Sequence, residues 1–138
     1  MKTYNEVVQE IITKVKAIEI IKDESFDYYN EDGGNYCDIT NDDEFSHLNI
    51  HVFSEFSELF YPISALISLD IYVTGEFFPE VEVYLSYNFA GGDIQELKAT
   101  NSEDYQKIIL KLDEIIAEYH KNVKILKEQN LIKNEVVK

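Results

Sequence analysis

Three segments in the middle of this chain alternate apolar and polar residues with a period of two, and this feature most constrains the fold. The segments span residues 48–56, 67–74 and 81–89. Because successive side chains of a strand point to opposite faces of a sheet, each segment predicts a strand with one buried face and one face in water. The short link 75–80 predicts an antiparallel hairpin for the last two strands, and the pair Gly91-Gly92 is expected to end the sheet.

Two segments with helical periodicity flank these strands. Residues 3–22 and 101–130 carry apolar side chains at three- and four-residue steps, which predicts two amphipathic helices. Each begins near a threonine that is followed three residues later by a glutamate, the spacing of a capping box. The second helix would extend about 45 Å, beyond a typical strand of about 17–20 Å. Two alternatives stay open: its C-terminal part, about residues 120–138, projects or mediates oligomerisation, or the helix packs along the whole sheet and then frays.

The order of these elements predicts the fold class. Both helices need an apolar surface to cover, and the predicted sheet offers one such face. We therefore predict an α+β fold, a two-layer sandwich in which an antiparallel sheet of three to five strands carries the N-terminal and the long C-terminal helix on one face. The 138 residues suit a single α+β domain, residues 1–138. The stretch 23–47 predicts either two short strands, 26–29 and 36–39, around a glycine-containing turn, or an irregular acidic loop.

Negative charge is concentrated between the two predicted helices. The chain has 27 acidic residues, 12 lysines and no arginine, and its net charge is −15. No lysine or arginine lies between Lys22 and Lys98, whereas residues 23–97 contain 17 acids. The segments on either side are nearly neutral, each with a net charge of +1. This distribution argues against a chain that binds nucleic acid or anionic lipid through charge attraction.

The anionic stretch has two interpretations. One is solubility, because net charge opposes aggregation. The other is a surface that imitates a polyanion, since carboxylates two residues apart on a strand lie about 6.6–6.8 Å apart on one face and a rigid array of them can occupy a cationic channel. Aromatic side chains on the wet sheet face would add packed anchors. The predicted partner-binding residues come from the segment 23–58 and from the wet sheet face: Asp27, Glu31, Asp32, Asp38, Asp42, Asp43, Glu44, Glu55, Asp70, Tyr72, Glu82 and Tyr84.

The sequence contains no recognisable catalytic or cofactor motif. It has no glycine-rich phosphate loop and no nucleophile elbow. His47 and His51 would lie about 13 Å apart on a strand, too far to share a metal ion without a bend. The acidic stretch that begins at Asp38 lacks the glycine and glutamate of a calcium-binding loop. We therefore predict that the protein is not an enzyme and has no catalytic residues, no metal site and no cofactor.

Compartment follows from weaker observations. The N-terminal residues contain no uninterrupted apolar run and no cleavage site typical of a secretory signal, and no segment is long and apolar enough to span a membrane. One cysteine, Cys37, cannot form an internal disulfide, which suits a reducing compartment. We expect a cytoplasmic protein, in the host cell cytoplasm if it is phage-encoded.

In size, charge and lack of catalytic motifs, the chain resembles the DNA-mimic proteins of phages and mobile elements, including anti-restriction and anti-CRISPR inhibitors. The resemblance covers no specific motif, so it assigns no residue. It implies a non-enzymatic inhibitor that binds a basic nucleic-acid-binding protein through an acidic, DNA- or RNA-mimicking surface, with no direct contact to nucleic acid or membrane. Two alternatives are an immunity protein or antitoxin that caps a cationic toxin, and a homo-oligomeric adaptor, joined through the C-terminal helix, whose charge serves only solubility.

Overall fold

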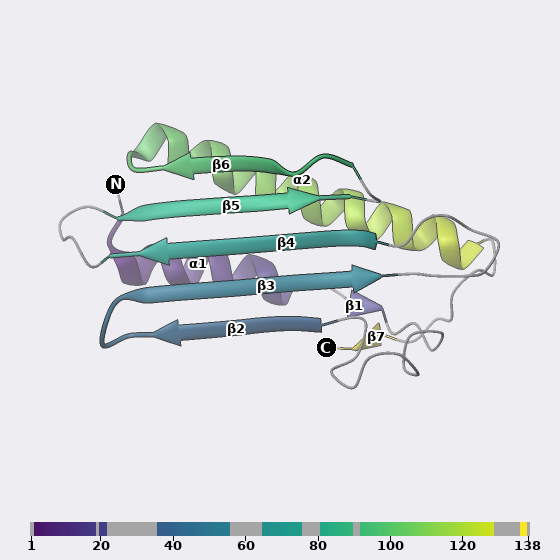
Figure 1. The fold of residues 1–138 in the computed structure, drawn as a ribbon, viewed down its shortest axis with the longest axis horizontal. Coiled ribbons are helices and arrows are strands. Elements are labelled where there is room, and N and C mark those ends of the chain that lie inside the picture. The colour runs from purple at the N-terminus through teal and green to yellow at the C-terminus, as the bar shows by residue number, and fades with distance from the viewer. Residues whose placement is uncertain are drawn as a thin grey trace.

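A computed structural model of the chain has an α+β fold, as predicted. It describes residues 2–18, 20–21, 36–55, 65–75, 81–89, 92–128 and 136–137. The two helices are α1 (Tyr4–Lys16) and α2 (Ser102–Glu128). The strands of the main sheet are β2 (Tyr36–Asp42), β3 (His47–Glu55), β4 (Ala65–Thr74), β5 (Glu82–Asn88) and β6 (Gln95–Ala99). Their order is β2-β3-β4-β5-β6, and each strand is antiparallel to the next, so the predicted β4–β5 hairpin is confirmed (Figure 1).

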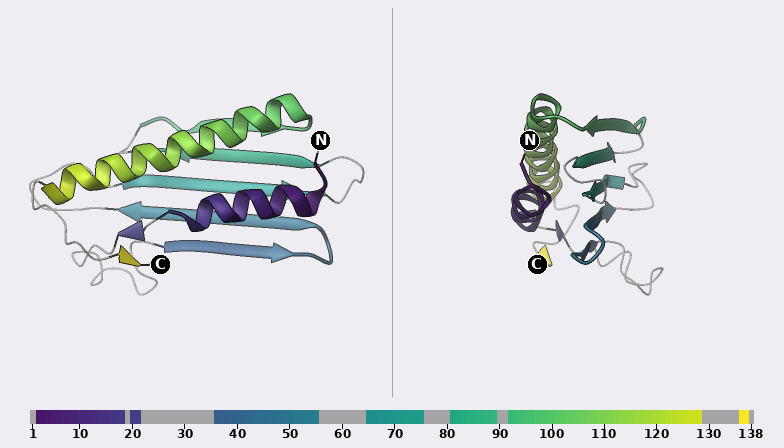
Figure 2. Two further views of the ribbon diagram at one scale, coloured as in Figure 1. Left: turned by 180° about the vertical axis from the view of Figure 1, so that it is seen from behind. Right: turned by 90° about the vertical axis from the view of Figure 1, so that its left-hand side faces the viewer.

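Both helices cover the same face of the sheet, which confirms the predicted two-layer arrangement (Figure 2). The core between the layers consists of the apolar residues at alternate strand positions and of the apolar stripes of α1 and α2. Leu48, Ile50 and Val52 of β3, for example, are fully buried, whereas Asn49 between them is exposed. The period-two pattern therefore indicates which face of each strand packs against the helices.

Neither helix in the described part of the chain has the length and apolar character that a membrane span requires.

Helix α1 starts as predicted but ends earlier. The Thr3 hydroxyl accepts a hydrogen bond from the Glu6 backbone N–H, and the Glu6 carboxylate accepts one from the Thr3 backbone N–H, which completes a capping box. The helix ends at Lys16 rather than at residue 22, and the short strand β1 (Ile20–Ile21) follows and pairs antiparallel with β7 (Val136–Val137). The prediction was too long because β-branched isoleucines continue the apolar pattern but also favour strands.

The sheet does not end at Gly91-Gly92, so that prediction was wrong. The backbone N–H of Gly92 donates a hydrogen bond to the Phe89 carbonyl at 2.7 Å, and the chain returns as β6 along the edge of β5. Only Ala99 of β6 is fully buried. The sequence QELKA lacks β-branched and aromatic residues, so its strand character comes from pairing with β5 rather than from a pattern that could be read beforehand.

Helix α2 closely matches the predicted range 101–130. Its N-cap is Asn101, not the expected Thr100: the Asn101 side-chain oxygen accepts a hydrogen bond from the Asp104 backbone N–H at 2.9 Å. The helix crosses the sheet obliquely, and its end reaches past the ends of the strands (Figure 2). Tyr119 and Val123, in the second half of the helix, are still buried. The helix is therefore packed against the rest of the fold at least as far as Val123.

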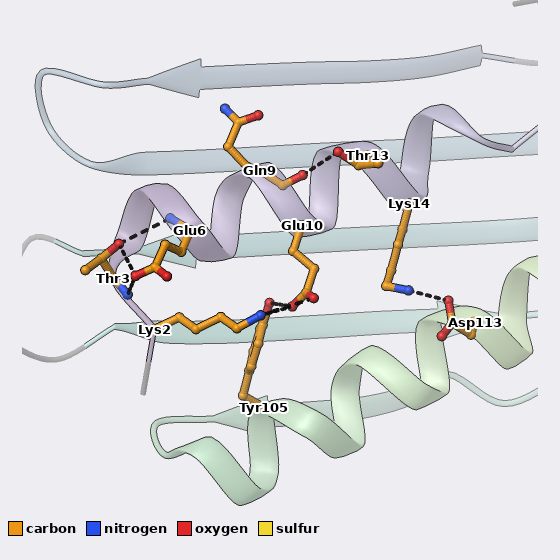
Figure 3. Close-up of polar contacts among 9 residues, drawn as sticks. All are labelled: Lys2, Thr3, Glu6, Gln9, Glu10, Thr13, Lys14, Tyr105 and Asp113. Carbon is orange, nitrogen blue, oxygen red and sulfur yellow. Dashed lines mark hydrogen bonds and ion pairs between the residues drawn. The ribbon is translucent and has the colours of Figure 1, made fainter.

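The helices are joined to each other by polar contacts at their edges (Figure 3). The Tyr105 hydroxyl donates a hydrogen bond to Glu10, which also pairs with Lys2 at 3.2 Å. Lys14 of α1 pairs with Asp113 of α2 at 2.8 Å. The hydrogen bond from Tyr105, more than the ion pair with Lys2, lowers the pKa of Glu10. Several acidic residues of the helical layer are thus compensated by nearby hydrogen-bond donors and cations.

Of the two short strands expected within residues 23–47, the second is present and longer than predicted. Residues 36–39 belong to β2, which pairs with β3. Residues 26–29 lie outside the described part of the chain. The structure therefore shows how β2 pairs with β3, and the predicted hairpin between residues 26–29 and 36–39 stays a prediction.

Candidate functional site

The face of the sheet that points away from the helices is the candidate functional site, and we call it the outer face. It is formed by every second residue of the five strands, and the register brings these residues side by side. They are Tyr36, Asp38, Thr40 and Asp42 of β2; His47, Asn49, His51 and Phe53 of β3; Ser68, Asp70, Tyr72 and Thr74 of β4; Glu82, Tyr84, Ser86 and Asn88 of β5; and Glu96 and Lys98 of β6. Neither helix lies on this side (Figure 2).

The charge of the outer face is strongly unbalanced. Among the residues just named, the carboxylates come from all strands except β3, and Lys98 is the one lysine. Lys98 is held by Glu82, with 3.2 Å between its Nζ and a carboxylate oxygen. The five carboxylates are Asp38, Asp42, Asp70, Glu82 and Glu96. The helical layer contrasts with this face, because Lys2, Lys14, Lys107 and Lys111 there all pair with acids.

One row of residues crosses the whole sheet and sets the spacing of the carboxylates. The register places Asp38, His51, Asp70, Ser86 and Glu96 opposite one another on successive strands. Adjacent strands lie about 4.8 Å apart, so the three carboxylates of this row recur at intervals of about 10 Å. The backbone hydrogen bonds of the sheet hold the Cα atoms of these residues at this spacing.

The two histidines of β3 lie between acidic and aromatic neighbours. His51 Nε2 is 3.7 Å from an Asp70 carboxylate oxygen, and its Nδ1 is 3.2 Å from the Tyr36 hydroxyl. The Tyr36 and His51 rings meet edge to face at 5.2 Å between centroids. His47 is arranged in a similar way, with its Nδ1 3.4 Å from the Tyr72 hydroxyl. Each histidine therefore has one ring nitrogen directed at a tyrosine on a neighbouring strand.

Tyrosines give the outer face apolar area next to its charges. Tyr72 is 38% exposed, and Tyr84 lies opposite it on β5. A hydrogen bond with Glu96, more than any other contact, raises the pKa of Tyr84 above its ordinary value. Aromatic side chains of this kind combine contact area with low conformational entropy, which suits protein recognition.

The turn between β2 and β3 extends the anionic surface beyond the sheet. The Asp42 carboxylate accepts a hydrogen bond from the Phe45 backbone N–H at 3.3 Å. Ser46 has a φ of 53°, and its carbonyl accepts a hydrogen bond from the Gly75 N–H at 2.9 Å. Asp43 and Glu44 lie in this turn with exposed side chains, and Phe45 is 61% exposed beside them. The turn thus places an apolar ring among three acids.

Most of the predicted partner-binding residues that the structure describes are brought together. Six of them lie on the outer face: Asp38, Asp42, Asp70, Tyr72, Glu82 and Tyr84. Asp43 and Glu44 occupy the adjacent turn. Glu55 ends β3, and its side chain is outside the described part, as are Asp27, Glu31 and Asp32 entirely.

Several members of this surface were not among the predicted binding residues, and Glu96, Tyr36 and Phe45 show why. Glu96 was missed because β6 was not predicted, and Tyr36 because the expected strand 36–39 had no assigned face. Phe45 was missed because a single apolar residue after the run Asp42-Asp43-Glu44 does not tell an exposed ring from a buried one. Its place between three acids and Ser46, a run rich in Asp and Ser of the kind typical of turns, was the available indication of a turn.

Other chemistry has less support in the described ranges. Within them, no group of three or more His, Cys, Asp or Glu residues is placed to hold a metal ion. Cys37 is an exposed residue of β2, and desolvation, followed by the charge of Asp38, raises the pKa of its thiol. On the helical side, a shallow cavity of about 210 Å³ lies between the end of β5 and α2, lined by Tyr87, Phe89, Lys111, Glu114, Ile115 and Glu118.

Comparisons with known proteins do not assign the chain. A scan against protein-family models found no match, and searches of curated proteins and of solved structures found no significantly similar protein. Function is therefore inferred from the charge and geometry of the outer face.

Proposed function

We propose that this protein is a non-enzymatic inhibitor that binds a basic nucleic-acid-binding protein through its outer face and competes with the nucleic acid for that partner. It acts in the cytoplasm, as a phage or mobile-element protein directed against a host defence such as CRISPR or restriction. The observation that carries the proposal is the segregation of charge: five carboxylates against one lysine on the outer face, and paired charges on the helical side.

The proposal depends on carboxylates that the sheet positions before a partner binds. A protein that grips nucleic acid presents lysines and arginines that must be neutralised together. A rigid sheet offers carboxylates on an already ordered backbone, so little backbone conformational entropy is lost on binding, and the open face allows a broad partner to approach. Such surfaces associate quickly, and their association is weakened by salt. Tyr72 and Tyr84 supply the packed contacts that charge alone does not provide.

An immunity protein or antitoxin that neutralises a cationic toxin is the second candidate, since the same anionic face suits it. The inhibitor and the antitoxin differ only in the identity of the partner. A homo-oligomeric adaptor differs from both, because its outer face would have no partner and α2 would form the contact between copies of the chain.

The test is affinity capture from the source cell with the wild-type chain and two variants. Asp38→Asn, Asp70→Asn and Glu96→Gln together remove the charge of the central row with little change of shape. The matched control, Glu103→Gln, Glu114→Gln and Glu118→Gln, removes three exposed carboxylates from α2. Circular dichroism confirms that both variants fold.

The proposal expects a nucleic-acid-binding enzyme that elutes with salt and is displaced by duplex DNA or RNA. Its affinity falls about tenfold in the central-row variant, if each exposed charge contributes about 0.2–1 kcal/mol, and stays near wild type in the control. Capture of a paired toxin would favour the second candidate. Equal binding by the two variants would refute the outer face as the contact, and salt-independent self-association would favour the adaptor.

A further inference from the structure

Two histidines of β3, His47 and His51, lie among the acidic residues of the outer face. His51 of β3 lies between Asp38 of β2 and Asp70 of β4 in the central row. The groups that face it are those two carboxylates and the Tyr36 hydroxyl, at 3.2 Å from Nδ1, while the nearer carboxylate is 3.7 Å from Nε2. The His51 side chain is 41% exposed, and both helices lie on the other side of the sheet, so water reaches the ring (Figure 2).

His47, at the other end of β3, repeats the arrangement. It lies between Asp42 of β2 and Thr74 of β4, and the Tyr72 hydroxyl is 3.4 Å from its Nδ1. The His47 and Tyr72 rings meet edge to face at 5.7 Å between centroids. Both histidines thus face a carboxylate of the outer face on a neighbouring strand.

These two positions control how the charge of the face responds to pH. Carboxylates titrate near pH 4 and lysines above pH 10, so neither changes charge between pH 5.5 and pH 8. Histidine is the side chain that does. With neutral histidines, the described charges of the outer face sum to four negative, and with both protonated they sum to two negative. Two protons therefore remove half of the net charge offered to a partner.

We propose that the outer face is a pH-sensitive docking surface whose affinity for a cationic partner weakens when His47 and His51 become protonated. The inference rests on the proposed function, because it concerns the same face. The sign follows from linkage: a cationic partner disfavours the protonated histidines, so binding expels their protons. Affinity is complete above the histidine titration range and is lost as the pH falls through it. An inhibitor of this design releases its target in an acidified environment.

The experiment uses isothermal titration calorimetry with an N-acetylated peptide of sixteen lysines, whose charge is constant over the range tested. Titrations are run at pH 8.0 and pH 5.5 in the same low-salt buffer. For wild type we expect the dissociation constant to rise about fivefold at the lower pH, the effect of two exposed charges. His47→Gln with His51→Gln is expected to abolish this rise. His120→Gln, which alters the histidine of α2, is the matched control and keeps it.

A second measurement avoids substitution. In proton NMR titrations of the wild type, adding the peptide should move the titration midpoints of two of the three histidines to lower pH and leave His120 unchanged. Any one of three results would overturn the inference. These are a wild-type affinity that is equal at both pH values, a full pH effect in the double histidine variant, and histidine titration midpoints that the peptide does not move.

Failure of the proposed function gives a different result. Binding at pH 8.0 that is weakened equally by the central-row variant and by the α2 control would mean that the peptide responds to total charge rather than to the outer face. That outcome refutes the docking face and the pH dependence together, whereas the outcomes of the previous paragraph refute only the latter.

Discussion

Replacing Tyr119 with phenylalanine should destabilise the protein by about 2 kcal/mol. Tyr119 of α2 is fully buried, and its hydroxyl donates a hydrogen bond of 2.8 Å to Ser54 Oγ of β3, which is also fully buried. The substitution removes the donor and keeps the ring. A buried hydrogen bond contributes about 0.5–1.5 kcal/mol, and a buried hydroxyl left without its partner costs about 1–3 kcal/mol. The change is large against a total stability of about 5–15 kcal/mol.

The assay is urea denaturation of a double-mutant cycle. Tyr119→Phe and Ser54→Ala are measured singly and together, with circular dichroism as the probe. Because the double variant leaves no buried hydroxyl of this pair without its partner, we expect it to be more stable than the sum of the single effects implies, by about 1 kcal/mol. A Tyr119→Phe effect below about 0.5 kcal/mol, or strict additivity, would refute the reasoning. Either result would mean that the hydrogen bond between Tyr119 and Ser54 adds little to the apolar packing of α2 on β3.

Three further predictions concern α1 and its surroundings. An added Cβ at Gly75 would lie 2.9 Å from Tyr4 Cβ, so Gly75→Ala should lower the free energy of unfolding in urea by about 1–3 kcal/mol. Burial, and then the charges of Asp43 and Asp42, raise the pKa of Tyr4 to about 12. The stability that the protonated Tyr4 hydroxyl contributes is present below pH 10 and is lost as the pH rises towards 12. The melting temperature of Tyr4→Phe should therefore fall less at alkaline pH than that of the wild type. The Tyr105 hydrogen bond lowers the pKa of Glu10. The stability that the Glu10 carboxylate contributes is therefore present above the unfolded pKa near 4.5 and is lost as the pH falls through the folded pKa. The melting temperature of Glu10→Gln should depend less on pH between pH 6 and pH 3 than that of the wild type.

The elements that the sequence predicted well are those whose two faces differ strongly. Each of β3, β4 and β5 alternates large aliphatic residues with polar ones over much of its length, and burial follows that alternation over residues 48–52, 67–73 and 82–85. Edge strand β6 has one fully buried residue, Ala99, so its amphipathic pattern is too weak to predict. The end of α1 was misplaced because the same isoleucines suit a helix and a strand, and the pairing of β1 with β7 joins residues more than a hundred positions apart.

The candidate site was predictable in composition but not in geometry. The absence of lysine over residues 23–97 is visible in the sequence, and it located the anionic region. Which acids become neighbours depends on strand register, which only pairing decides: Asp38 meets His51 rather than another residue of β3 because the turn after Asp42 has four residues. Asp93, an acid of the same stretch, precedes β6 and lies outside the outer face.

The division of the sheet into two faces has a consequence for how this chain can change. Residues directed at the helices hold the layers together, whereas their alternate neighbours make little contact with the core. Substitutions at the latter positions are expected to change the folding free energy by only about 0.5 kcal/mol where the side chain is exposed, and by more where it packs on a cross-strand neighbour. A combinatorial library restricted to β2–β6 positions that point away from α1 and α2 would therefore vary the chemistry of this surface and leave the residues that join the layers unchanged.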